Sequence, residues 1–121
     1  MFMTPRDVPI LFGGGRLSLR VPASADTLTG PQIPKLADPA AAVRSALQNP
    51  IASESLRSIA EAKSPGSVVI TMSDITRPVP NELLITAILA ELNAVGIADS
   101  ACTILIATGM HRPSTAEERE V

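Results

Sequence analysis

Two short polar clusters carry the side chains of this chain that are best suited to chemistry. The first, residues 73–81, follows the apolar run 67–72, and the second, residues 108–113, follows the apolar run 102–107. Together they hold one acid, two arginines, two threonines and the chain's single histidine. Two strands joined by a helix run parallel, and ligands of open α/β sheets bind where the carboxyl ends of such strands meet. We therefore expect both clusters to line one crevice.

The first cluster combines an anion-binding side chain with a stiff loop. Arg77 offers a planar fork that matches a carboxylate or a phosphate, and Pro78 and Pro80 fix the backbone on either side of Val79. Asn81 is the expected N-cap of the next helix, whose first amides favour an anion. Asp74 could hold the ligand groups, or it could cap its own turn or pair with Arg77, and both interpretations stay open.

His111 is the candidate acid/base group of the second cluster. Histidine takes and gives a proton near neutral pH, and the preceding Gly109 allows a sharp turn or the close approach of a ligand. Asp74, at the end of the neighbouring strand, is placed to orient the imidazole. The competing interpretation is a scaffold in which Asp74, Arg77 and His111 form a purely structural polar network.

Composition argues against several classes of protein. One histidine and one cysteine cannot supply a structural zinc site, and no metal ligand is assigned. Cys102 lies in an apolar run, is expected to be an inert core thiol, and fits a reducing compartment. A net charge of −2, with two Phe and no Tyr or Trp, argues against nucleic acid as a partner. No membrane span or secretory signal is evident, so we expect a cytoplasmic protein without a membrane partner.

The elements that position the clusters follow from the hydrophobic pattern. After a loose lead-in over residues 1–8, two strands at 9–12 and 16–21 flank a triple-glycine turn. Asp38-Pro39 predicts the start of one helix, and Ser53 is the expected cap of a second.

The run 67–72 is apolar on both faces, which is typical of a central parallel strand covered on both sides. A helix from about residue 81 to residue 95 follows, with Glu91 as its one polar interruption and Gly96 as its left-handed terminator. The prediction is an α/β fold with a Rossmann-like parallel βαβ core and helices on both faces, preceded by an N-terminal β-hairpin.

A further helix start lies close to residue 121. Residues 114–117 match a capping box, and Thr115 with Glu118 is an overlapping alternative. We therefore expect residues 1–121 to be an N-terminal α/β domain, a fragment of a longer protein whose C-terminal part lies beyond Val121.

Segments 73–81 and 107–113 resemble the N-terminal domain of the nickel-pincer lactate racemase family. The resemblance extends to the glycine turn at 13–15 and to segments 46–51 and 93–97. The Asp-x-Thr-Arg-Pro element together with the Gly-x-His-Arg element, about thirty residues apart, is what makes the resemblance specific.

The resemblance implies a racemase or epimerase of 2-hydroxy acids. In that family a hydride leaves the substrate α-carbon for a nickel-pincer nucleotide (the pyridinium-3,5-bisthiocarboxylic acid mononucleotide of nickel) and returns to the other face, while two histidines move the hydroxyl proton. The family's site residues match His111 as the catalytic acid/base group, Arg77 and Asp74 as substrate-binding residues, and, as cofactor-binding residues, Thr76, Thr108, Gly109 and Arg112.

The resemblance also implies what residues 1–121 lack. The second acid/base histidine, the lysine that tethers the cofactor and the histidine that ligates nickel lie beyond Val121, so the fragment alone is expected to be inactive. The implied partners are a small 2-hydroxy acid and the C-terminal remainder of the chain, and no oligomeric state is predicted. Met110 stands where the family often carries a small polar residue, which leaves open a substrate other than lactate. The alternative function is a non-catalytic α/β module that binds a phosphate or carboxylate.

Overall fold

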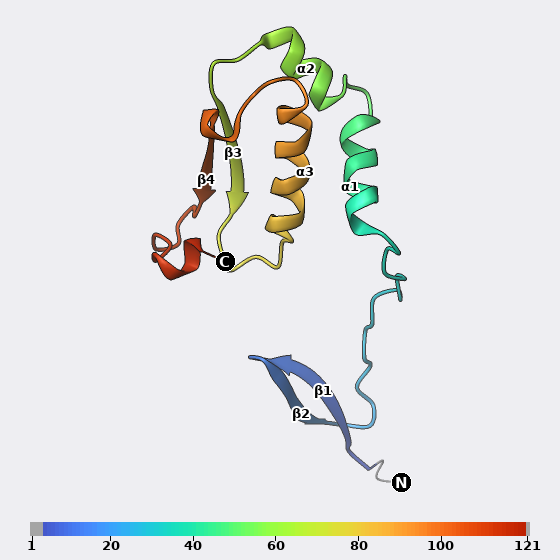
Figure 1. Ribbon diagram of the computed structural model, residues 1–121. Coiled ribbons are helices and arrows are strands. Elements are labelled where there is room, and N and C mark those ends of the chain that lie inside the picture. Colours follow the sequence, from blue (N-terminus) through green and yellow to red (C-terminus); the bar gives the residue numbers. More distant parts are fainter. Residues whose placement is uncertain (1–3, 121) are drawn as a thin grey trace. The chain divides into compact units, whose positions relative to one another are not determined.

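The computed structural model describes residues 4–120 (Figure 1). The chain divides into two compact units, Met1–Lys35 and Leu36–Val121, which are taken one at a time below. No helix among residues 4–120 has the length and apolar character needed to cross a membrane.

The first unit is an antiparallel hairpin. β1 (Arg6–Phe12) pairs with β2 (Gly15–Val21), with Arg6 opposite Val21 and Phe12 opposite Gly15. Gly13 turns the chain with a φ of +54°, a value that glycine adopts without strain. The predicted hairpin is confirmed, but the loose lead-in over residues 1–8 is wrong from Arg6 on, because those residues already pair with β2. Residues 1–3 lie outside the described part of the chain.

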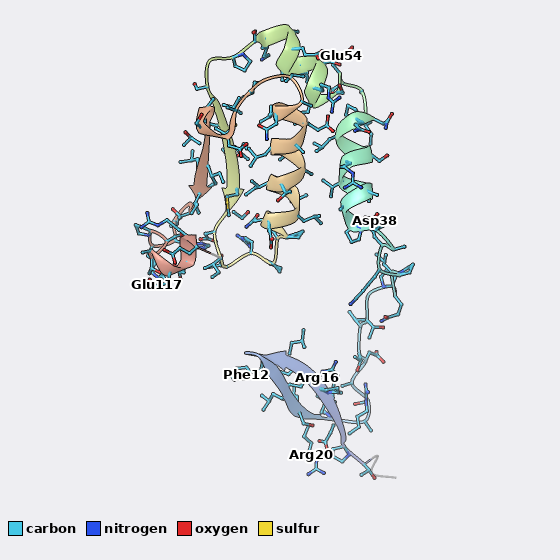
Figure 2. All side chains as sticks on the ribbon, in the orientation of Figure 1. Phe12, Arg16, Arg20, Asp38, Glu54 and Glu117 are labelled. Carbon is cyan, nitrogen blue, oxygen red and sulfur yellow. The ribbon has the colours of Figure 1, made fainter. Side chains whose placement is uncertain are left out.

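The second unit opens with two helices. α1 (Pro39–Gln48) begins as predicted, since Asp38 Oδ1 accepts a hydrogen bond of 2.8 Å from the amide of Ala41 (Figure 2). α2 (Leu56–Lys63) is capped by Ser55, whose Oγ lies 3.1 Å from the amide nitrogen of Ser58. The predicted cap, Ser53, is wrong because its hydroxyl donates to the carbonyl of Glu54.

A parallel strand pair and its crossover helix complete the unit. β3 (Val68–Ser73) pairs in parallel with β4 (Cys102–Ala107), so that Ser73 and Ala107 end side by side. α3 (Asn81–Asn93) connects them, and the short 3₁₀ helix η1 (Asp99–Ala101) leads into β4. Gly96 ends the α3 segment with a φ of +85°, as predicted. A second short 3₁₀ helix, η2 (Glu117–Arg119), lies near the end of the chain.

The core lies between the strand pair and the helices. Ala60 of α2, Ile70 of β3, Leu92 of α3 and the following Ile97 form one buried cluster. On the other face of the strand pair, 60% of Val69 is exposed. The α/β class, the parallel βαβ unit and the hairpin are confirmed. Within residues 36–120, however, the helices gather on one side of the strands (Figure 1), so a full Rossmann core with helices on both faces is not confirmed.

Glu91 joins the three helices. Its side chain is buried on α3, and Oε1 accepts a hydrogen bond of 3.0 Å from Gln48 of α1. Oε2 lies 3.1 Å from Nε and 3.0 Å from Nη2 of Arg57 on α2. These partners offset the cost of burying a carboxylate, so the polar interruption in the α3 pattern is a point of attachment for α1 and α2.

Candidate active site

The loop after β3 buries a carboxylate. Asp74 follows the last residue of β3 and is only 6% exposed. Its Oδ1 accepts hydrogen bonds from the amide of Thr76 at 3.2 Å and from the Thr76 hydroxyl at 2.6 Å. Its carbonyl accepts from the amide of Arg77 at 3.2 Å. Asp74 therefore caps its own turn, and its second carboxylate oxygen remains for another partner.

That partner comes from the loop after β4. Gly109 takes a φ of +59°, and the amide of His111 donates to the carbonyl of Thr108 at 3.0 Å, which closes a turn. This turn brings His111 Nδ1 to 2.6 Å from Asp74 Oδ2. The Thr76 hydroxyl lies 3.5 Å from the same ring nitrogen. The two clusters thus meet at the carboxyl ends of the parallel strands.

The contact with Asp74 assigns the protons of the imidazole. An ionised carboxylate only accepts hydrogen bonds, so Nδ1 carries the proton that is shared with Asp74. In the neutral ring, Nε2 then has a free lone pair and can accept a proton. The His111 side chain is 45% exposed, which leaves it accessible to a ligand. This is the arrangement that a general base requires.

Hydrogen bonds keep Asp74 ionised. The Thr76 hydroxyl, and after it the His111 ring, lower the pKa of the Asp74 carboxyl below its ordinary value, and this outweighs the opposing effect of burial. The carboxylate is therefore charged at neutral pH and can stabilise the imidazolium that forms when Nε2 takes up a proton.

Arg77 lies beside a cleft of about 360 Å³ that opens next to Asp74. Among the described residues its guanidinium has no hydrogen-bond or ion-pair partner, so it is available to an anion. Apolar side chains such as Met72, Ile75, Val79 and Ile106 also line the cleft, together with the carboxylates of Glu82 and Glu118. A cleft of this kind holds a ligand through a few polar groups while apolar walls exclude water.

Asn81 also lines this cleft, but it does not cap α3. It is the first residue of the helix, Pro80 occupies the cap position, and no side chain accepts from the first turn. The predicted N-cap is therefore wrong, because Val79 accepts the Asn81 amide in a tight turn that carries Asn81 one position too far into the helix.

Arg112 points to a partner that the sequence analysis did not assign to it. Its guanidinium donates to both carboxylate oxygens of Glu118, at 2.9 Å and 2.7 Å. This pair raises the pKa of Arg112 and lowers the pKa of Glu118 to about 2. The sequence predicted a capping box of Thr115 and Glu118, but it gave no signal that Glu118 also pairs with Arg112, six residues before it.

Comparison with known proteins places this chain in a family. A family model described as the lactate racemase N-terminal domain matches residues 12–121. The chain belongs to this family. A lactate racemase of Lactiplantibacillus plantarum is 45% identical over 76 residues, and a lactate racemase of Thermoanaerobacterium thermosaccharolyticum is 41% identical over 76 residues. Each alignment covers 63% of this chain and 17% of the relative, so the matched stretch spans less than a fifth of either relative.

This lactate racemase N-terminal domain brings part of the predicted site together. Asp74, Thr76 and His111 form one hydrogen-bonded group, and Arg77 lines the adjoining cleft. Arg112 turns to Glu118 instead. Thr108 is half-buried, and an added Cβ on Gly109 would meet nothing within 4 Å. No group of three or more His, Cys, Asp or Glu side chains that could hold a metal is found in residues 4–120.

Proposed function

We propose that this chain is the N-terminal part of a 2-hydroxy acid racemase or epimerase in which His111 is an acid/base group. The observation that carries the proposal is the 2.6 Å contact between His111 Nδ1 and buried Asp74, in a chain of the lactate racemase N-terminal domain family. That contact leaves Nε2 as the atom that removes and restores the proton of the substrate hydroxyl. A positioned histidine of this kind contributes about 10²–10⁴-fold to a rate.

Arg77 is the proposed carboxylate-binding residue. Its guanidinium has no partner among residues 4–120, and a planar fork binds a carboxylate through two parallel hydrogen bonds. Binding the carboxylate there fixes the 2-hydroxyl relative to His111 across the same strand ends. Asp74 acts on the substrate through the imidazole, because both of its oxygens are already occupied by Thr76 and His111.

The turn at Gly109 leaves room for a bound nucleotide. When bound, the nickel-pincer nucleotide supplies the hydride acceptor that a substrate C–H beside a carboxylate needs. Gly109 offers backbone with open space where a Cβ would stand, and Thr108 precedes it in the same turn. Thr76 remains a proposed cofactor contact, whereas the Arg112 guanidinium is taken up by Glu118. The tethering lysine, the nickel ligand and the second histidine are proposed to lie in the C-terminal remainder. We also propose the cytoplasm as the compartment.

The test uses the full-length protein, produced together with the proteins that make the cofactor. Chiral chromatography of D- and L-lactate and of longer 2-hydroxy acids should detect interconversion of at least one pair. His111→Gln should lower kcat by about 10²–10⁴-fold. Lys63→Gln, at the end of α2, is the matched surface control and should leave turnover unchanged.

Normal turnover by the His111→Gln protein would remove His111 from the mechanism. No interconversion of any enantiomer pair by the full-length parent protein would favour the non-catalytic alternative. The guanidinium of Arg77, which has no partner among residues 4–120, is the observation that supports this alternative. In that case the protein would bind a hydroxy acid or phosphate through Arg77 and convert neither enantiomer, and Arg77→Gln would abolish binding.

A further inference from the structure

The loop that carries His111 is closed by a clasp, which we define as Arg112, Thr115 and Glu118. Arg112 donates two hydrogen bonds to the Glu118 carboxylate. The same carboxylate accepts from the amide of Thr115 at 2.9 Å, and the Thr115 hydroxyl accepts from the amide of Glu118 at 3.3 Å. Two hydrogen bonds thus join Arg112 to Glu118, and two more join Glu118 to Thr115. Glu118 lies in the short helix η2, in which Figure 2 labels Glu117.

The clasp lies directly against the Asp74–His111 pair. A small cavity of about 60 Å³ is lined by Asp74, Thr76 and His111 together with Arg112 and Glu118 of the clasp. The pair with Glu118 is the main cause of the raised pKa of Arg112, and the charge of Asp74 adds a smaller contribution. Arg112 follows His111 directly in the chain, and any movement of its backbone therefore moves the imidazole.

The clasp stays charged at neutral pH. The hydrogen bond from Arg112, and after it the amide of Thr115, lower the pKa of Glu118 to about 2. The Glu118 carboxylate is therefore ionised at neutral pH and accepts the hydrogen bonds of Arg112 and Thr115 in that state.

Little else fixes this loop. Residues 108–116 contain no helix or strand. The His111 backbone is held by the hydrogen bond from its amide to Thr108, and its imidazole by Asp74 and, at 3.5 Å, the Thr76 hydroxyl. We propose that Arg112 and Glu118 are positioning residues that hold the His111 imidazole against Asp74. The kinetic consequence rests on the proposed function, whereas the geometric consequence does not.

Two variants of the full-length holoenzyme test the clasp. Glu118→Gln replaces one acceptor oxygen by an amide that faces the donors of Arg112 and Thr115, and Arg112→Lys keeps the charge but loses the fork. Glu120→Gln makes the same charge change as Glu118→Gln two residues away, at an exposed side chain, and is the matched control.

The first measurement is independent of racemisation. Nitrogen-15 NMR of labelled histidine, with His111 assigned by its loss in His111→Gln, should report the Nδ1–H tautomer in the parent protein. In Glu118→Gln the signal should shift towards the mixed tautomers of a free imidazole, while Glu120→Gln should match the parent. An unchanged His111 signal in a folded Glu118→Gln protein, or in Arg112→Lys, would overturn the proposal even if no substrate is ever found.

The second measurement separates positioning from direct binding. A displacement of about 1 Å in a reacting group costs about 10²-fold, so Glu118→Gln should lower kcat by about 10- to 100-fold with KM changed less than about twofold. The nickel content of the purified protein should equal that of the parent. A loss of nickel in Arg112→Lys, or a rise in KM with unchanged kcat, would instead mean that Arg112 binds a ligand directly and would contradict the proposal.

Discussion

Asp74 uses its two carboxylate oxygens for two different purposes. Oδ1 caps the turn that ends β3 through Thr76, and Oδ2 holds Nδ1 of His111. The structural and functional interpretations of this residue are therefore compatible, because one buried side chain serves the loop and the imidazole together. A sequence pattern can identify the acid and the histidine, but it cannot assign the separate oxygens.

Asp74→Asn should disturb the tautomer and orientation of the His111 imidazole while leaving the turn at Thr76 largely intact. The asparagine oxygen can still accept from Thr76, but its amide group would then face Nδ1–H and disfavour the required tautomer. We expect kcat to fall by about 10²-fold or more, with a smaller change in KM. Steady-state kinetics of the full-length enzyme provides the measurement, and a kcat equal to that of the parent would contradict the assigned tautomer.

The clasp should also make the stability of the protein depend on pH in the acid range. The pKa of Glu118 is about 2 in the folded chain and 4.5 ordinarily. A carboxyl with a depressed pKa contributes its full stabilisation above pH 4.5 and loses it as the pH falls towards 2. The difference in thermal midpoint between the parent and Glu118→Gln should therefore be largest near neutral pH and shrink below pH 4.5. A difference that stays constant from pH 7 to pH 3 would argue against the ion pair.

At the scale of elements, α3 both connects the parallel strands and anchors the other two helices through Glu91. Periodicity predicted the helices and strands correctly because their existence depends on local pattern. It failed for the predicted helix caps Ser53 and Asn81, because the backbone conformation of a single residue decides at which position a helix begins. It identified Glu91 as an interruption but not its partners, since Gln48 and Arg57 are 43 and 34 residues away.

Removing the Glu91 carboxylate should loosen all three helices. Glu91→Ala leaves Arg57 and Gln48 without their acceptor, and we expect a loss of about 1–3 kcal/mol of unfolding free energy. Glu61→Ala, at an exposed position of α2, is the control and should stay within about 0.5 kcal/mol of the parent. Denaturant unfolding followed by circular dichroism measures both, and equal midpoints for the two variants would contradict the anchoring role.

At the scale of the whole molecule, the parallel pair exposes apolar side chains on the face away from the helices. Val69 and Leu105 are more than half exposed there. The sequence run 67–72 indicated a strand covered on both sides, and the described residues cover only one. The sequence therefore predicted the adjacent ends of the two parallel strands, which depend on local pattern, better than the layers around the sheet, which depend on distant segments.

Residues 1–121 alone should be inactive. The proposed tether, nickel ligand and second histidine lie outside them, and the matched stretch amounts to 17% of each relative. Produced with the cofactor-making proteins, the fragment should give no detectable interconversion and no bound nickel, whereas the full-length protein should give both. Chiral chromatography and elemental analysis check this, and turnover by the fragment would contradict the assignment of those three residues.

The anchored ring nitrogen has a stereochemical consequence for the proposed racemase. With Nδ1 held by Asp74, His111 would meet the substrate only through Nε2 and therefore from one side of the substrate. Mirror-image hydroxy acids have equal free energies, so the ratio of kcat/KM in the two directions is fixed by thermodynamics. Loss of a group that serves one side must therefore reduce the forward and reverse efficiencies by the same factor, however unequal its contacts with the two enantiomers.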